Sequence, residues 1–392
     1  MSKKYIANNI ASMPTSGIRK FFDIVSTMED VVSLGVGEPD FETPWHVREE
    51  AISSIEKGRT AYTSNQGMIN LRQAISDYLY NKYNIKYDAE SEVLVTVGAS
   101  EGIDLSLRAI CNSGDEILVV EPSYVSYKPC IVMAGGVPVV VETKEENDFR
   151  LTVDDIKEKI TDKAKAIIFP YPNNPTGAIM EKKDLEAIAD IIIENDLIVI
   201  SDEIYSELTY DGHHVSIASL PNMWDRTIVL NGFSKSFAMT GWRLGYAVAP
   251  KKFIEQMTKI HQYIIMCAPT MSQYAGLDAL TNEYRDEDID IMRESYNERR
   301  KVMVEGFRKM GLSCFEPKGA FYVFPCIKST GLTSEEFCEK LLYDEKVAVV
   351  PGTAFGECGE GFIRCSYAYS VDSIRLALER IERFVNKIRE VN

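Results

Sequence analysis

The sequence predicts an α/β protein, with a mostly parallel central sheet in a large domain and a smaller α/β domain beside it. Three observations support this fold class. The chain has 392 residues, which is long enough for about two domains and a large core. From Glu92 to Ala249, short apolar runs alternate with helical segments, a pattern typical of a parallel sheet. Beyond Pro250 the alternation stops, and a long helix over Glu287–Met310 leads into a second unit of mixed composition.

Composition argues against several classes of function. The formal net charge of −16 disfavours binding to nucleic acid. The eight cysteines have no CxxC spacing and only four histidines accompany them, so we expect no metal site and a reducing compartment. No apolar run approaches the roughly 18 residues of a membrane helix, and the N-terminus lacks the apolar stretch of a signal peptide. We therefore expect a cytoplasmic protein that binds neither nucleic acid nor membrane.

The first 80 residues of the sequence predict three helices and one strand. A helix is expected over Thr15–Met28, and a strand over Val31–Leu34 that runs into a glycine-rich turn. Thr43 is the expected N-cap, and Pro44 the first residue, of the next helix. Apolar residues then recur at helical spacing within Met68–Tyr80.

The central sheet is expected to contain seven short strands. Several are apolar along their whole length, as is typical of strands whose two faces are both covered by helices. In such sheets ligands bind beyond the carboxyl ends of the strands. The expected strands are Val93–Val97, Ile117–Val120, Val137–Val141, Ala166–Phe169, Ile198–Ser201, Ile228–Leu230 and Leu244–Val248.

Two candidate residues follow the first two strands. Ser100 lies in the small-residue run that opens a helix, where free backbone N–H groups and its hydroxyl are suited to an anion. A plain helix cap is the alternative for Ser100. Tyr124 follows the second strand, where its ring is suited to stacking on a flat ligand, and a core tyrosine is the alternative.

Polar residues also follow the fourth and fifth strands. Asn174 lies in a loop held by three prolines, where its amide could bond a ring hydroxyl or a carboxylate, although Asn also forms turns. Asp202 ends a buried strand and is costly to bury without a cation. That cation could be the protonated nitrogen of a pyridine ring, which Tyr205 would also reach, or simply an arginine of the protein.

The stretch Ile228–Tyr246 carries a candidate amine nucleophile. Lys235 follows an apolar strand, and a lysine in such a place shifts its pKa readily. Ser234 and Arg243 are both good ligands for phosphate oxygens. Together these residues suggest a covalently held, phosphate-bearing cofactor, which for an amine means pyridoxal phosphate. The alternative is that Lys235 is an ordinary surface lysine.

Beyond the long helix, the second unit is expected to contain both strands and helices. Arg364 lies within an apolar strand and requires a carboxylate, either from the protein or from a ligand. The expected elements are strands over Ala320–Phe324, Ala348–Val350 and Phe362–Tyr367, a helix near Ser334–Tyr343, and a last helix after Ser370.

Over essentially its whole length, the chain resembles the class I/II pyridoxal-phosphate-dependent aminotransferases of fold type I. Eight motifs in the family's order carry this resemblance. They are SLGVGEPDF (33–41), AYTSNQG (61–67), VGASEG (97–102), EPSYVSY (121–127), YPNNPTG (171–177), SDEIYSELTY (201–210), SKSFAMTGWRLGY (234–246) and FIRCSYA (362–368).

The resemblance implies a role for each matching residue in holding pyridoxal phosphate. Lys235 would be the catalytic residue that binds the cofactor as a Schiff base, and Asp202 would pair with the pyridine nitrogen. Tyr124 would stack on the ring, and Asn174 and Tyr205 would bond its oxygen. The implied phosphate ligands are Ala99, Ser100, Ser234, Arg243 and, from the other subunit, Tyr62.

The resemblance also implies the substrates and the assembly. Arg364, Asn174 and the backbone of Gly37 would hold the α-carboxylate of an amino acid, whose amino group passes to a 2-oxo acid by ping-pong kinetics. A homodimer with shared active sites follows from the role of Tyr62. A β-lyase on the same scaffold is the alternative reaction, because fold alone does not decide chemistry. A protein that only binds a ligand is disfavoured because Lys235 is present.

The expected domains are an N-terminal arm with part of the small domain (1–44), a large cofactor-binding domain (45–285) and a small C-terminal domain (286–392). The substrate side-chain pocket is expected around Ile18, the Tyr124–Tyr127 region and the partner's Tyr263 region. These regions are more aromatic and apolar than cationic, which favours aromatic or other bulky amino donors. The overall pattern looks closest to aminotransferases of the aromatic, aspartate and acyl-diaminopimelate types.

Overall fold

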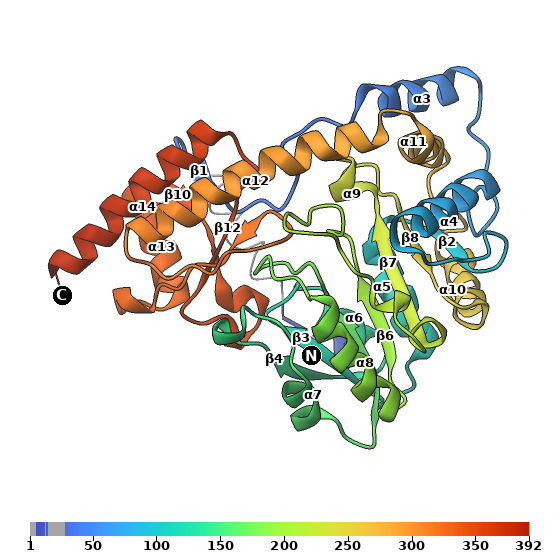
Figure 1. Ribbon diagram of the computed structural model, residues 1–392, viewed down its shortest axis with the longest axis horizontal. Helices are drawn as coiled ribbons and strands as arrows, with labels where there is room; N and C mark the ends of the chain where they lie inside the picture. Colours follow the sequence, from blue (N-terminus) through green and yellow to red (C-terminus); the bar gives the residue numbers. More distant parts are fainter. Residues whose placement is uncertain (1–4, 12, 15–27, 392) are drawn as a thin grey trace.

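The computed structural model describes residues 5–11, 13–14 and 28–391, and a seven-stranded sheet forms its centre (Figure 1). The strand order is β2-β8-β7-β6-β5-β3-β4. Only β8 runs antiparallel to its neighbours β2 and β7, so the predicted mostly parallel sheet is confirmed. The strands are β2 (Val93–Thr96), β3 (Glu116–Glu121), β4 (Val137–Glu142), β5 (Ala164–Phe169), β6 (Ile198–Asp202), β7 (Thr227–Gly232) and β8 (Gly245–Val248).

Helices cover both faces of this sheet, which explains why most of its strands are apolar along their length. Leu94 and Ile168 point to one face, which is covered by α5 (Gly98–Ile110), α6 (Tyr127–Met133) and α10 (Lys251–Ile264). Val95 and Ile167 point to the other face. The helices on that face are α3 (Trp45–Glu56), α4 (Ile69–Tyr83), α7 (Val153–Lys159), α8 (Lys182–Glu194) and α11 (Thr270–Thr281).

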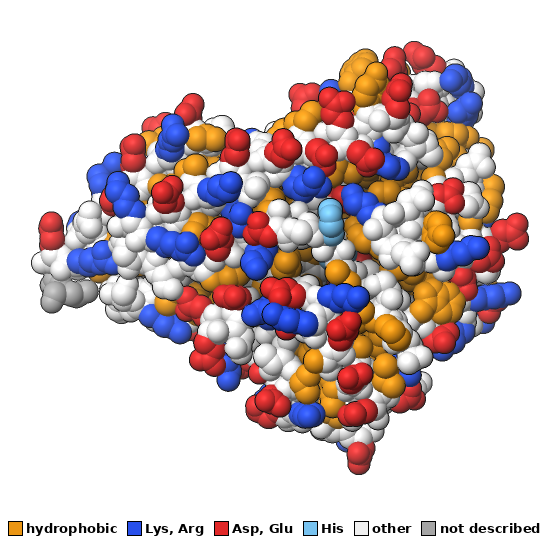
Figure 2. Space-filling model, viewed as in Figure 1, with side chains coloured by type: hydrophobic (Ala, Val, Ile, Leu, Met, Phe, Trp, Pro, Cys, Tyr) orange, Lys and Arg blue, Asp and Glu red, His pale blue; other side chains and the backbone are white. Residues whose placement is uncertain are grey.

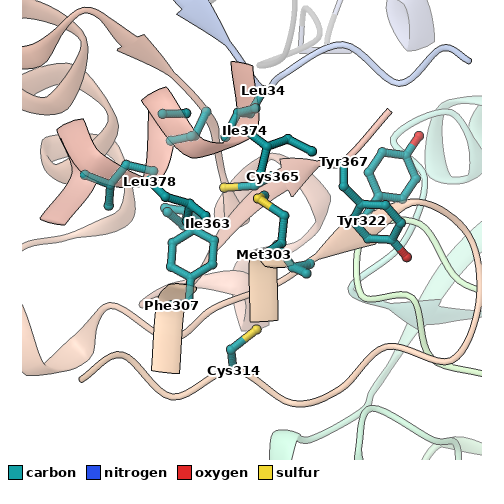
Figure 3. Packing of buried hydrophobic residues seen from close by; sticks show 14 of the residues in the cluster. Leu34, Met303, Phe307, Cys314, Tyr322, Ile363, Cys365, Tyr367, Ile374 and Leu378 are labelled. Carbon is teal, nitrogen blue, oxygen red and sulfur yellow. The ribbon is translucent and has the colours of Figure 1, made fainter. Parts of the chain in front are cut away.

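A second body is built mainly from the C-terminal part of the chain, and the long helix α12 (Arg285–Lys309) runs into it from the region of α11 (Figure 1). Figure 3 shows its core, where Met303 and Phe307 of α12 meet Ile363 and Cys365. The other helices of this body are α13 (Ser334–Glu345) and α14 (Val371–Val391). Its three-stranded antiparallel sheet consists of β11 (Val350–Pro351), β12 (Ile363–Ser366) and β9 (Tyr322–Val323).

The segment before the large sheet also joins this second body. β1 (Val32–Ser33) pairs in parallel with β10 (Val347–Ala348), and the Leu34 N–H donates to the Ala348 carbonyl. The turn after β1 therefore leaves the second body and enters the sheet region, carrying Gly37 with it. Two short α-helices of the described residues are α1 (Asn8–Ala11) and α9 (Phe233–Ser236).

Some expected elements differ from those observed. Thr43 is not the cap of α3: Pro44 holds that position, and the Thr43 hydroxyl instead donates to the Ala238 carbonyl and accepts from Trp242 Nε1. The expected strand Ala348–Val350 divides between β10 and β11, which pair with different partners. Helices α10 and α11, which lie between Pro250 and Glu287, were not predicted from the sequence. The helix expected over Thr15–Met28 lies almost entirely outside the described residues.

The surface view in Figure 2 shows acidic and basic side chains interspersed over one face of the molecule. Hydrophobic side chains interrupt this charged surface over α3, where Trp45, Ile52 and Ile55 are exposed. None of the helices in the described part of the chain is long and apolar enough to cross a membrane.

Candidate functional site

A cavity of about 740 Å³ lies at the carboxyl edge of the central sheet. Strands β2, β3, β5, β6 and β7 are parallel to one another and all end at this edge. Strand β8 runs the other way, so its amino end, preceded by Arg243, reaches the same place. The sequence-predicted residues that line the cavity are Gly37, Ala99, Ser100, Tyr124, Asn174, Asp202, Tyr205, Ser234, Lys235, Arg243 and Arg364.

Lys235 projects into the cavity from α9, just beyond the end of β7. Its Nζ donates a hydrogen bond of 2.6 Å to the Gly37 carbonyl. The pKa of this ammonium is lowered to about 8, chiefly by burial; Glu38 and Asp202 favour the charged form, and Arg364 and Arg243 disfavour it. Lys235 is therefore converted to the free amine, which is the nucleophilic form, at a lower pH than an exposed lysine.

Asp202 is the last residue of β6 and is only 6% exposed. Its carboxylate accepts a hydrogen bond of 2.8 Å from the Tyr127 hydroxyl and one from the Ile204 N–H. Burial raises the pKa of Asp202, and these two hydrogen bonds only partly offset that effect. The arginine proposed as an alternative partner does not hydrogen-bond it among the described residues, so the carboxylate is suited to a cationic ligand atom.

Arg364 enters the cavity from the middle of β12 and is 3% exposed. Its Nη1 donates to Asn174 Oδ1 at 3.0 Å and its Nη2 donates to the Gly35 carbonyl. The Nε is buried without a hydrogen-bond partner, and no carboxylate of the described residues pairs with the guanidinium. A buried cation in this state is suited to an anionic ligand, because an uncompensated buried charge is costly.

The other end of the cavity is built around the start of α5. A Cβ placed on Gly98 would lie 2.5 Å from Arg243 Nη2, and Gly98 has a positive φ of 73°. Glycine at this position therefore lets the guanidinium approach the first turn of the helix. Ala99 and Ser100 lie in that turn, where backbone N–H groups lack helical partners, and Ser234 also lines the cavity. This end of the cavity is a positively polarised cradle.

Four tyrosines also line the cavity. The Tyr205 hydroxyl lies 2.8 Å from that of Tyr322, and the rings of Tyr124 and Tyr127 meet edge to face at 5.7 Å. Tyr127 was predicted only as part of a pocket wall, and Tyr322 was not predicted. A signal existed for Tyr127, because it lies three residues after Tyr124 and could share its side of a turn. The two-residue strand β9 gave no signal for Tyr322.

Two predicted site residues are not brought into the cavity of this chain. Tyr62 is 81% exposed and does not line the cavity, and Tyr263 is 87% exposed. Both had been assigned to a site shared with another subunit. Ile18 lies outside the described residues.

The chain matches known proteins over nearly its whole length. The model of the family "Aminotransferase class I and II" matches residues 29–381. An aspartate aminotransferase of Pyrococcus abyssi is 49% identical, over 95% of this chain and 96% of its own length. An aromatic-amino-acid aminotransferase of Thermococcus litoralis is 44% identical, over 97% of this chain and 98% of its own. The crystal structure of an aromatic aminotransferase from Pyrococcus horikoshii superposes with a TM-score of 0.91 at 47% identity, covering 95% of this chain and all of that one.

Proposed function

The chain belongs to the class I and II aminotransferase family and is an aminotransferase, and we propose that its cavity is the active site, with Lys235 as the covalent attachment point of pyridoxal phosphate. Members of this family use that cofactor. One observation carries the proposal. An amine with a pKa of about 8 projects into a cavity that also contains a buried, acceptor-only carboxylate and a buried guanidinium.

The charges of the cavity fit the groups of pyridoxal phosphate. The cradle of Gly98, Ala99, Ser100 and Arg243 suits a phosphate, because it combines a helix N-terminus with a guanidinium. Asp202 suits the protonated ring nitrogen, which would supply the cation that its carboxylate lacks. With Lys235 in the same cavity, the chain offers a matching group for each part of the cofactor.

Pyridoxal phosphate, when bound, supplies an electron sink that stabilises negative charge developing at the α-carbon of the substrate. The side chains of the protein would hold the ring proton, move the substrate proton and bind the carboxylate. Asp202 holds the proton on the ring nitrogen. The free amine of Lys235 would take the proton from the substrate α-carbon as a general base and, as the acid, would deliver it to the C4′ carbon of the cofactor. Arg364 and Asn174 bind the α-carboxylate, which fixes the substrate's orientation and favours loss of the proton over loss of carbon dioxide.

We propose that the amino donors are aromatic, aspartate-like or otherwise bulky amino acids. Tyr124, Tyr127 and Ile103 line the cavity, and besides Lys235, Arg243 and Arg364 no cation of the described residues does so. With those three groups engaged, one chain offers an apolar and aromatic environment to a donor side chain. The relatives named above carry both aspartate and aromatic specificities in their names.

A panel of amino donors against 2-oxoglutarate and pyruvate tests both the reaction and the preference. The purified protein should absorb visible light, and this band should bleach when an amino acid is added without a 2-oxo acid. A protein that stays colourless after addition of the cofactor would overturn the proposal. Release of pyruvate and ammonia from a β-substituted amino acid would indicate the β-lyase alternative, which the aminotransferase names of the relatives do not favour.

We also propose a homodimer in which Tyr62 serves the partner's active site. Tyr62 and the segment Tyr263–Met266 are exposed hydrophobic neighbours on the surface. Asn65 donates to the Met266 carbonyl at 2.8 Å, so the two segments lie side by side. A contiguous exposed apolar patch of this kind is typical of a protein interface. A cytoplasmic location remains a proposal that rests on the scattered cysteines of the sequence.

A further inference from the structure

Tyr322 has a buried hydroxyl that lies close to Tyr205 and to the backbone of Gly37. It lies in β9, is 1% exposed, and lines the cavity. Its Oη is 2.8 Å from Tyr205 Oη. A Cβ placed on Gly37 would lie 2.5 Å from the same Oη, so the Gly37 backbone packs directly against this hydroxyl. Gly37 is also the residue whose carbonyl accepts from Lys235.

The ring of Tyr322 has a separate neighbour. The guanidinium carbon of Arg364 lies 4.6 Å from the centre of the Tyr322 ring and 4.8 Å from that of Phe355. Arg364 has no carboxylate partner among the described residues, so these two aromatic faces add to the hydrogen bonds that accommodate its charge. The hydroxyl and the ring of Tyr322 therefore contact two different parts of the cavity.

The number of protons available determines which of the two hydroxyls, Tyr205 or Tyr322, donates to the other. A tyrosine hydroxyl has one proton to donate. If Tyr205 donates that proton to the ring oxygen of the cofactor, it must accept from Tyr322. We propose that Tyr322 is a positioning residue of the active site: its hydroxyl donates to Tyr205 and aims the Tyr205 proton at the cofactor, while its ring holds the guanidinium of Arg364. This inference rests on the proposed function.

The proposed hydrogen-bond chain has an electrostatic consequence. The deprotonated cofactor carries negative charge on its ring oxygen, and a donor to that oxygen favours the deprotonated form. A donor that itself accepts a hydrogen bond is polarised and becomes a stronger donor. Loss of the Tyr322 hydroxyl should therefore raise the pH at which the visible absorption of the bound cofactor changes.

The decisive experiment is a pH titration of the visible absorption in three variants of the cofactor-loaded protein. In Tyr322→Phe the midpoint should rise by about 0.5 pH unit, and in Tyr205→Phe by more. The double variant should match Tyr205→Phe, because the Tyr322 hydroxyl acts through Tyr205. Tyr367→Phe is the matched control. Tyr367 is fully buried in the same core cluster, its hydroxyl donates to the Ala320 carbonyl, and it does not line the cavity (Figure 3).

Steady-state kinetics separate the ring from the hydroxyl. Tyr322→Phe keeps the ring beside Arg364, so the KM for the amino donor should stay within about twofold while kcat falls. Tyr322→Leu removes the ring and should raise the KM by about tenfold or more.

Two results would overturn the inference: a Tyr322→Phe midpoint equal to that of the wild type while Tyr205→Phe shifts, or shifts that simply add in the double variant. A wild-type protein without any visible band would overturn the proposed function, and this inference with it.

Discussion

At the scale of single residues, the proposed chemistry depends on the protonation state of Lys235. Burial lowers its pKa to about 8, and the nearby carboxylate of Glu38 opposes that shift. In the cofactor-free protein, the rate of cofactor capture should rise with pH with a midpoint near 8, because only the free amine reacts.

Substitution of Glu38 tests the same electrostatic account. Glu38→Gln removes the charge that favours the ammonium, so the midpoint for cofactor capture should move to lower pH. Stopped-flow absorbance at a series of pH values measures both midpoints. An unchanged or higher midpoint in Glu38→Gln would contradict this account of the Lys235 environment.

The buried carboxylate of Asp202 should serve catalysis but lower the stability of the cofactor-free protein. Its pKa is raised by burial, so at neutral pH the ionised carboxylate opposes folding, and the stability of the cofactor-free protein should rise as the pH falls through this pKa. Asp202→Asn should therefore leave the cofactor-free protein at least as stable in urea, since the amide oxygen still accepts from Tyr127.

The same substitution, Asp202→Asn, should lower the rate of catalysis. An amide cannot hold the proton on the ring nitrogen, so Asp202→Asn should lower kcat by about 10² to 10⁴-fold. Tyr127→Phe keeps the carboxylate and should cost much less. Equal losses of activity in the two variants would contradict the assigned role of Asp202.

The sequence predicted the residues of the cavity whose chemistry and position both stand out. Asp202 and Lys235 each lie at or just beyond the end of an apolar strand, so strand topology alone places them together. Tyr322 was not predicted, because its position depends on how a two-residue strand of the second body meets the large sheet. A tyrosine in an apolar sequence gives no sign of where its hydroxyl points.

At the scale of elements, His46 connects three helices. It lies in the first turn of α3, and its two ring nitrogens contact Asp278 of α11 and Asp288 of α12, the latter at 2.8 Å. Both ring nitrogens face carboxylates, so both must carry protons for the two contacts to be hydrogen bonds. Burial lowers the pKa of His46, but the two carboxylates outweigh burial and the pKa is raised overall.

This arrangement predicts a pH-dependent contribution to stability. A histidine whose pKa is raised by folding stabilises the protein fully when the pH is below its pKa in the unfolded state, about 6.5. This stabilisation is lost as the pH rises through the pKa of the folded state. His46→Gln should therefore lower the free energy of unfolding by about 1–2 kcal/mol at pH 6, and by less at pH 9. Urea denaturation at both pH values measures the difference. His213 is exposed, and the same substitution there should leave the free energy of unfolding unchanged at both pH values. A loss in His46→Gln that is equal at the two pH values would contradict the role assigned to His46.

The element pattern was predictable where local sequence decides it. Helix α8 has the bounds that the sequence predicted, because its apolar residues recur at helical spacing between polar ends. The direction of β8 was not predictable, since an apolar strand buried on both faces reads the same whichever way it runs. Likewise, nothing in the sequence around Thr43 shows that its hydroxyl bonds Ala238 and Trp242, which are about 200 residues away, instead of capping α3.

At the scale of the whole molecule, the proposed homodimer makes the active site depend on two chains. The protein should have a mass in solution of twice the 44.2 kDa of the chain, as measured by light scattering. The exposed Tyr62, which lies away from the cavity of its own chain, should serve the partner's site.

Subunit mixing tests this arrangement. Lys235→Ala and Tyr62→Ala homodimers should each be impaired, but refolding them together should restore up to about a quarter of wild-type activity, because half of the dimers then contain one intact site. If Tyr62 served its own chain, no site of the mixed dimer would be intact. Absence of any recovery in a verified mixed dimer would therefore contradict a shared site.

At this scale, the two-body architecture could be predicted from the sequence of one chain, but the donor preference could not. The two-body architecture follows from the change of pattern after Pro250, and the observed second body agrees with it. The donor preference does not follow, because Ile18 lies outside the described residues and Tyr263, expected from the partner, does not line the cavity of its own chain.

The covalent attachment of the cofactor at Lys235 is the central claim, and one measurement tests it most directly. The cofactor-loaded protein is reduced with borohydride, digested, and its peptides are identified by mass spectrometry. The account predicts a single cofactor adduct on the peptide that contains Lys235 and its loss in Lys235→Ala. An adduct on a different lysine, or none in a protein that transfers amino groups, would contradict it.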